Sequence, residues 1–117
     1  IIASLQSQGA GPMPVNICNQ LSLAELAGFF RAHCKGIVGN DSGPFHLAAA
    51  LGLPGVVMFG PTDVELWRPL SASNHVIKGS SGCSPECTRS SCQFEHRCLT
   101  SISPSMIMER LLPLLAS

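Results

Sequence analysis

Two short runs of apolar residues in the middle of the chain contain no alternating polar positions. They are Gly36–Gly39 and Gly55–Phe59. Runs of this kind are typical of strands that are buried on both faces of a parallel sheet. Two weaker strand candidates are Val15–Cys18, which alternates, and Asn74–Ile77. The pattern therefore predicts a sheet of about four strands, in which the two apolar runs are fully covered.

A helix is predicted between the two apolar runs. Pro44 suits the first position of a helix, residues 46–51 favour helix, and Gly52 with Pro54 ends it. The resulting strand-helix-strand unit belongs to a parallel sheet, and its crossover should be right-handed.

A second helix should begin before the first apolar run. Ser22 and Glu25 have the spacing of a capping box, in which each residue satisfies a backbone N–H group of the other. Apolar residues then recur at helical spacing until about residue 32. The residues expected on the buried face are Leu23, Leu26, Ala27 and Phe30.

Helices are also expected at both ends of the chain. Ser103 and Pro104 start the last one, which Pro113 should bend or end. Its expected core residues are Ile107, Leu111 and Leu112. A first helix is expected over Ile1–Ser7. Because the chain begins inside this helix, and on Ile rather than Met, we expect it to be a fragment of a longer protein.

The alternation of strands and helices predicts an α/β fold, with a parallel sheet layered by helices. A chain of 117 residues that is 45% apolar fits one domain, residues 1–117, with a real core. Seven basic residues balance seven acidic ones, so no broad charged surface for nucleic acid is expected. No apolar stretch reaches the roughly 20 residues that a membrane span requires.

Polar residues follow the two apolar strands directly. Asp41-Ser42-Gly43 leaves the first strand, and Gly60-Pro61-Thr62 leaves the second. Because ligands of open parallel sheets bind at the carboxyl ends of the strands, these two loops can share a ligand. The helix that starts near Pro44 offers unpaired backbone N–H groups and its positive dipole end to an anion.

The residues of this turn leave its role open. Gly43 would let a phosphate approach closely, whereas the carboxylate of Asp41 would repel it. Asp41 is therefore expected to cap the helix, to accept a hydrogen bond from a sugar hydroxyl, or to hold the loop. Taken without further context, Asp-Ser-Gly-Pro slightly favours a plain capped turn, and His46 a structural histidine.

A resemblance changes this balance. The run GIVGNDSGPFHLAAALGLPGVVMFGPTDVELWRPL, residues 36–70, is similar to the donor-binding signature of glycosyltransferase family 9, which contains the ADP-heptose:lipopolysaccharide heptosyltransferases. The resemblance extends from about Val15 to the last helix. It implies a Rossmann-like C-terminal half of a two-domain, inverting GT-B enzyme, the half that binds a nucleotide sugar.

The resemblance also implies roles for individual residues. The loop that wraps the diphosphate and the adjacent sugar corresponds to Asp41, Ser42, Gly43, Pro44 and His46. The position of Leu21 lies by the base, and Thr62 is a further polar contact. Family members carry the acceptor site and the general base in the other domain, so no catalytic residue is expected here and the isolated chain should be inactive.

Partners and location follow from the same resemblance. The donor would be ADP-heptose or a similar nucleotide sugar, and the acceptor a lipid-linked glycan such as the lipopolysaccharide core. The enzyme would be bacterial and cytoplasmic, peripheral at the inner membrane, with no required cofactor. Backbone N–H groups and positive side chains can stabilise a departing diphosphate without Mg²⁺.

Four of the six cysteines crowd into the Cys-rich loop, residues 79–98. They are Cys83, Cys87, Cys92 and Cys98, with His96 among them. This density permits a structural zinc site, although no Cys-x-x-Cys pair occurs. Disulfides formed during preparation and reduced, packed thiols are the alternatives, and together they are favoured. Cys18 and Cys34 are expected to be buried in the core.

Two other functions compete with that of a transferase domain. The chain could be a non-catalytic module that binds a nucleotide or phosphate through the same turn. It could also be a zinc-stabilised interaction domain whose functional end is the Cys-rich loop. Trp67, in either case, is expected to pack as an anchor for its own loop, and Arg68 to reach a phosphate or to face solvent.

Overall fold

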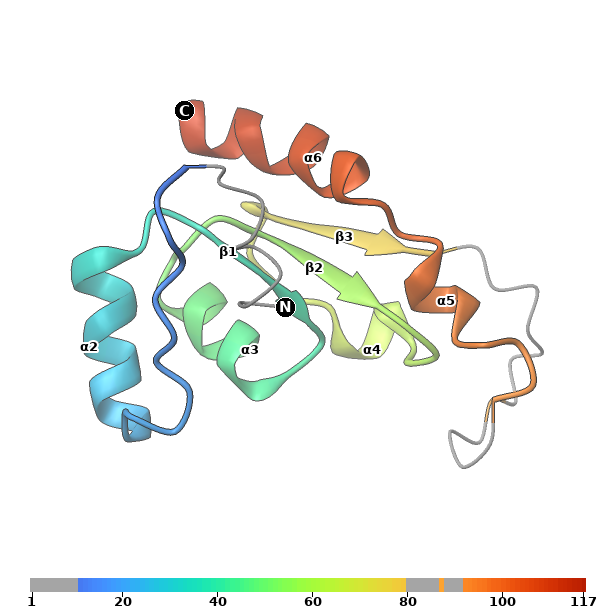
Figure 1. The fold of residues 1–117 in the computed structure, drawn as a ribbon, viewed down its shortest axis with the longest axis horizontal. Coiled ribbons are helices and arrows are strands. Elements are labelled where there is room, and N and C mark those ends of the chain that lie inside the picture. The colour runs from blue at the N-terminus through green and yellow to red at the C-terminus, as the bar shows by residue number, and fades with distance from the viewer. Residues whose placement is uncertain (1–10, 80–86, 88–91) are drawn as a thin grey trace.

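The structure is a computed structural model that describes residues 11–79, 87 and 92–117. Its centre is a parallel sheet of three strands in the order β1-β2-β3 (Figure 1). The strands are β1 (Ile37–Asn40), β2 (Gly55–Phe59) and β3 (Asn74–Lys78). Both pairings are parallel, with Ile37 opposite Gly55 and Gly55 opposite Asn74. The parallel α/β fold expected from the sequence is therefore confirmed.

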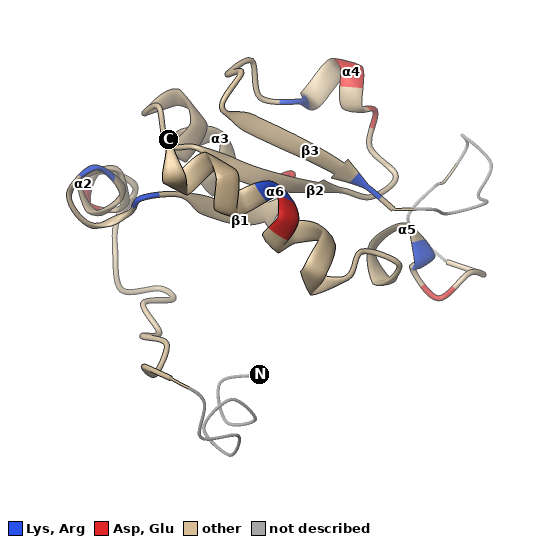
Figure 2. Ribbon diagram, turned by 90° about the horizontal axis from the view of Figure 1, so that it is seen from above, with Lys and Arg blue, Asp and Glu red and all other residues tan. Residues whose placement is uncertain are grey.

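Helices cover both faces of this sheet (Figure 1). The described helices are α2 (Leu23–His33), α3 (Gly43–Ala50), α4 (Val64–Trp67), α5 (Arg97–Thr100) and α6 (Pro104–Ala116). Lys, Arg, Asp and Glu residues are scattered along the described elements (Figure 2). Within the described ranges, no helix combines the length and the apolar character needed to cross a membrane.

Alternate residues of β2 point into two separate layers of core. Val57 and Phe59 pack with Phe45 of α3 on one face, and all three are almost completely buried. Val56 packs on the other face with Ile77 of β3, together with residues of α5 and α6. The strand β2 is therefore buried on both sides, as its unbroken apolar sequence predicts.

The predicted sheet differs from the observed one at its N-terminal side. Val15–Cys18 forms no strand: Val15 is 84% exposed, and the N–H of Cys18 bonds to the nearby side chain of Asn16. The strand β1 is covered on one face only, since Val38 is 42% exposed. Among the described residues β1 is an edge strand, because Val15–Cys18 does not pair with it. An alternating segment of four residues forms a strand only when another strand pairs with it. The predicted helix over residues 1–7 lies outside the described residues.

The helix α2 begins as predicted, with a complete capping box formed by Ser22 and Glu25. Its buried face is the expected one, with Leu26, Ala27 and Phe30 covered, except at Leu23. Leu23 is 70% exposed, whereas Phe30 is buried and Leu26 and Phe29 pack beside it. Leu23 precedes the part of the helix that contacts α3, so its side chain reaches no core.

The helix α6 starts after the predicted cap Ser103 and continues through Pro113 to Ala116. The prediction that Pro113 could end it is therefore wrong. Ile107, Leu111 and Leu114 pack against the core, but Leu112 is 56% exposed. A proline close to the end of a helix removes one backbone hydrogen bond, and the packing of the neighbouring leucines retains the last turn.

The capping box of α2 makes a testable contribution to stability. Ser22→Ala should lower the free energy of unfolding by about 1 kcal/mol, because the serine hydroxyl accepts a hydrogen bond from the N–H of Glu25. In return, the backbone N–H and the hydroxyl of Ser22 both donate to the Glu25 carboxylate. These two hydrogen bonds, the backbone one with the larger effect, lower the pKa of Glu25 below its usual value of 4.5.

This lowered pKa sets the direction of the pH dependence. A carboxyl group whose pKa falls on folding stabilises the protein above its unfolded pKa, and this contribution is lost as the pH falls through the folded value. Urea denaturation of wild type and Ser22→Ala at neutral pH, and again well below pH 4.5, should therefore show a smaller difference in acid. A difference that is equal at both pH values would contradict the prediction.

Candidate functional site

The turn between β1 and α3 leaves the first helical N–H groups available. Ser42 is the N-cap of α3, but its hydroxyl donates to the carbonyl of Asn40 at 3.1 Å and caps no N–H group. Pro44 has no N–H group, and the N–H of His46 donates to the carbonyl of Ser42. Within the described residues, the N–H groups of Gly43 and Phe45 have no backbone or side-chain acceptor. Together with the helix dipole they form an anion-binding arrangement.

Asp41 holds this turn and does not cap it. Its backbone N–H donates to the carbonyl of Met58 on β2 at 3.2 Å. Its Oδ1 lies 3.0 Å from Nε2 of His46, one helical turn into α3. The Asp41 side chain is 15% exposed and that of His46 40%. Of the roles expected for Asp41, the geometry supports holding the loop, since the carboxylate is directed at the imidazole.

The neighbouring loop reaches the same place. After β2, Gly60 and Pro61 lead to Thr62, and Asp63 caps the short helix α4 by accepting from the N–H of Glu65 at 2.9 Å. A cavity of about 340 Å³ lies between the two loops. Its lining residues are Asp41, Ser42, Gly43, His46, Thr62 and Trp67. A second hollow of about 200 Å³ adjoins it and shares Asp41 and Thr62.

Most of the predicted ligand-contacting residues are thus brought together. Asp41, Ser42, Gly43, His46 and Thr62 all line the cavity, at the carboxyl ends of β1 and β2 (Figure 1). Pro44 sits at the start of α3 and contributes its fixed backbone. The space beside Gly43 is open, because a Cβ atom built there would meet nothing within 4 Å. A ligand can therefore come close to the backbone at this point.

Of two further predictions about this region, the one for Trp67 is wrong and the one for Leu21 stays a prediction. Trp67 is 57% exposed and lines the cavity, so it does not serve as a buried anchor for its loop. The expectation was wrong because α4 is one turn long and its aromatic residue projects beyond the core. Leu21 precedes the cap of α2 and lines neither the cavity nor the adjoining hollow, so its predicted contact with a base stays a prediction.

The cysteines are only partly described. Cys83 lies outside the described residues, whereas Cys87, Cys92 and Cys98 are free thiols. Cys98 is buried in α5, and Cys92 accepts a hydrogen bond from the N–H of His96. The described residues contain no group of three or more metal-ligating side chains. The zinc site at Cys83, Cys87, Cys92 and Cys98, with His96, therefore stays a prediction.

The two cysteines expected to be buried in the core, Cys18 and Cys34, are both less buried than predicted. Cys18 is exposed, because the segment that carries it forms no strand. Cys34, directly after α2, is half-buried and packs beside Phe30 and Leu53.

A parallel sheet whose two strand-to-helix loops enclose one cavity at the start of a helix is typical of Rossmann-like domains that bind nucleotides or phosphates. Residues 1–97 match the glycosyltransferase family 9 (heptosyltransferase) family. The chain therefore belongs to glycosyltransferase family 9.

Curated relatives agree with this assignment. The chain is 37% identical to lipopolysaccharide heptosyltransferase 2 of Salmonella typhimurium, over 86% of this chain and 29% of the relative. It is 38% identical to lipopolysaccharide heptosyltransferase 2 of Escherichia coli, over 72% of this chain and 24% of the relative. The chain thus spans less than a third of the length of these relatives.

A solved structure supports the fold. The glycosyl transferase family 9 protein of Veillonella parvula superposes with a TM-score of 0.75 at 21% identity, over 98% of this chain and 33% of the other. At this identity the likeness concerns the fold alone.

Proposed function

We propose that this chain is the donor-binding half of an inverting glycosyltransferase of the GT-B fold. The donor is a nucleotide diphosphate sugar such as ADP-heptose, and the acceptor is a lipid-linked glycan such as the lipopolysaccharide core. The observation that carries the proposal is the cavity shared by the turn at residues 41–46 and Thr62. Similarity to two lipopolysaccharide heptosyltransferases supports heptose as the transferred sugar.

The start of α3 suits the diphosphate. The N–H of Gly43, which lines the cavity, and the positive end of the helix can stabilise the negative charge that develops on the diphosphate as the sugar departs. Fixed donors of this kind stabilise a leaving group without reorganising, and they require no metal ion. The enzyme is accordingly proposed to need no cofactor for transfer.

His46 and Asp41 act together at the edge of the cavity. Because Asp41 accepts a hydrogen bond from Nε2, the imidazole is held with a fixed ring plane beside the start of α3. The rest of the ring can contact a phosphate oxygen or a sugar hydroxyl. Trp67 adds an exposed aromatic surface on the opposite loop, which suits the apolar face of a sugar or base.

The rest of the reaction belongs to a second domain. An inverting displacement needs a general base on the acceptor hydroxyl, and we place this base in the part of the enzyme beyond the 29% of the Salmonella relative that this chain matches. The acceptor also binds there. A donor made in the cytoplasm and a lipid-linked acceptor place the whole enzyme in the cytoplasm, peripheral at the inner membrane.

Donor binding can be tested at His46. In the full-length enzyme, His46→Ala should weaken the affinity for ADP-heptose by about tenfold or more, because a hydrogen bond to a charged group is lost. Isothermal calorimetry measures this, with His33→Ala as the matched control, since His33 lies exposed on α2 and outside the cavity. Equal affinities of wild type and His46→Ala would contradict the proposed donor site.

A further inference from the structure

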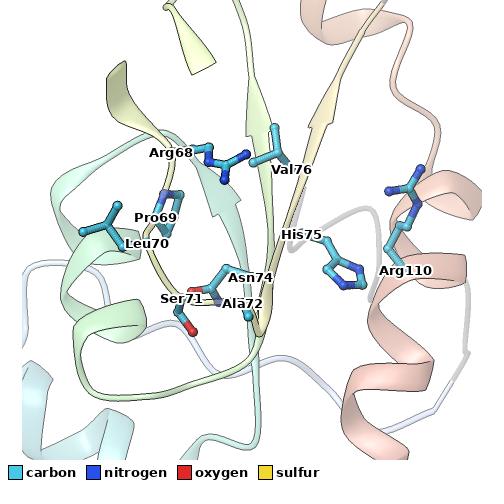
Figure 3. A pocket seen from close by; sticks show the side chains of 9 residues that line it. All are labelled: Arg68, Pro69, Leu70, Ser71, Ala72, Asn74, His75, Val76 and Arg110. Atoms are coloured by element: carbon cyan, nitrogen blue, oxygen red, sulfur yellow. The ribbon is translucent and has the colours of Figure 1, made fainter. Parts of the chain in front are cut away.

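A groove of about 420 Å³ lies along the edge of β3 that faces away from β2 (Figure 3). Residues 74–76 of β3 form its floor. One wall is the segment 68–72, which connects α4 to β3, and Arg110 of α6 lies on the other side. We call this feature the edge groove. It is separate from the cavity at the carboxyl ends of the strands and shares no lining residue with it.

The floor of the edge groove offers backbone hydrogen bonds. Among the described strands β3 pairs with β2 alone, so its other edge has no neighbouring strand, although the N–H of Asn74 already donates to the carbonyl of Ser71 at 3.1 Å. Such an edge is a template on which an extended peptide can add as a further strand. Within the groove, the part of β3 that follows the N–H of Asn74, up to Val76, is thus the part of the sheet that can be extended.

Cationic side chains flank this edge on both sides. Figure 3 shows Arg68 and Arg110 on opposite sides of β3, the first from the connecting segment and the second from α6. Within the described residues neither forms an ion pair with a carboxylate, and no acidic residue lines the groove. Successive side chains of a strand point to opposite faces of its sheet. Two consecutive acidic residues on an added strand would therefore reach one arginine each.

Unsatisfied polar atoms lie at the same place. In the described part of the chain, the buried side-chain atoms without a hydrogen-bond partner are Oδ1 of Asn74 and Nδ1 of His75. Both residues line the groove, and Asn74 is 91% buried. Buried polar atoms are normally paired, and these two exceptions lie on the two faces of β3, because successive side chains of a strand point to opposite faces. Leu70 on the rim is fully exposed and offers an apolar contact.

We propose that the edge groove binds an extended peptide segment with two consecutive acidic residues, which adds as a strand to β3. The backbone of β3 supplies affinity, and Arg68 and Arg110 select the acidic pair, one from each face. The partner is thus a protein with an acidic, extended segment. This inference does not depend on donor binding, because no residue of the donor cavity takes part in it.

The proposal is tested with three synthetic peptides and the full chain. The first has an Asp-Glu pair in a background of Val and Thr, the second replaces the pair by Asn-Gln, and the third keeps the pair but carries N-methyl groups on alternate backbone nitrogens. Fluorescence anisotropy should show that the first binds. The second should bind about fivefold or more weakly, since two exposed ion pairs are lost. The third should lose binding, because N-methylation removes the donors that face β3.

Variants of the groove locate the binding site. Arg68→Gln and Arg110→Gln should each lower the affinity for the acidic peptide by about two- to fivefold and leave the affinity for the Asn-Gln peptide unchanged. Arg31→Gln is the matched control, because Arg31 is an exposed arginine on α2 outside the groove. Hydrogen exchange of β3 amides should slow when the acidic peptide is bound.

Three outcomes would overturn the proposal. The N-methylated peptide could bind as well as the first, which would mean that charge alone attracts the peptide. Arg31→Gln could weaken binding as much as the groove variants. Glucose 6-phosphate could displace the acidic peptide and depend on both Arg68 and Arg110, which would make the groove a site for a small phosphorylated ligand.

Discussion

Gly43→Ala in the full-length enzyme should lower kcat/KM by about 100-fold while the protein remains folded. Gly43 is the first residue of α3 and lines the cavity between the two loops. A glycine at this position lets a diphosphate approach the backbone N–H groups, and a methyl group would occupy that approach. The loss should appear as weaker donor binding as well as slower transfer.

The fold should tolerate this change, because a Cβ atom on Gly43 meets no other atom within 4 Å. Gly28→Ala is the matched control: Gly28 lies in α2, is exposed, and also has open space where a Cβ would stand. Alanine there should raise the free energy of unfolding by about 0.5–1 kcal/mol and leave kcat/KM unchanged. If Gly43→Ala retained full activity, the start of α3 would not be the diphosphate site.

Phe59→Ala should lower the free energy of unfolding by about 3–5 kcal/mol. Phe59 is completely buried at the end of β2, where it packs with Phe45 and Val57 between the sheet and α3. Removing the ring leaves a cavity that the surrounding strand and helix cannot fill. Urea denaturation followed by circular dichroism measures the loss.

The control for this variant is Phe59→Leu, which keeps most of the volume and should cost less than about 1.5 kcal/mol. Because Phe59 directly precedes the loop that carries Thr62, Phe59→Ala should also reduce donor affinity through that loop. A destabilisation by Phe59→Ala no larger than that by Phe59→Leu would show that this side of the core is loosely packed.

The elements that depend on neighbouring residues were predicted well. The capping box of Ser22 and Glu25, the start of α3 at Gly43-Pro44 and its end near Gly52 involve residues a few positions apart. Such contacts form within one turn of helix, so the sequence carries the information they need. The unbroken apolar run of β2 likewise indicated burial on both faces.

Features that need a distant partner were predicted less well. Val15–Cys18 has the alternation of a strand, but a strand exists only when another strand pairs with it. Trp67 and Arg68 are adjacent in the sequence, yet they line different cavities, because the chain turns between them at the end of α4. No local pattern in the sequence indicates that these two adjacent residues line different cavities.

The candidate site shows the same limit. All of its lining residues except Trp67 are predicted from the motif and from the resemblance to a glycosyltransferase family, and the two loops are expected to meet because parallel strands end at one edge of a sheet. The pairing of Asp41 with His46 was not foreseen, since it depends on how the turn folds back over the first turn of α3.

The kinds of element, their order and the family are properties of the sequence itself, because they depend on local propensity, periodicity and motif. The packing of the sheet left Leu23 at the start of α2 exposed, left both β1 and β3 as edge strands among the described residues, and placed arginines on both sides of β3. These features arise from contacts between residues far apart in the chain, and no local pattern specifies such contacts.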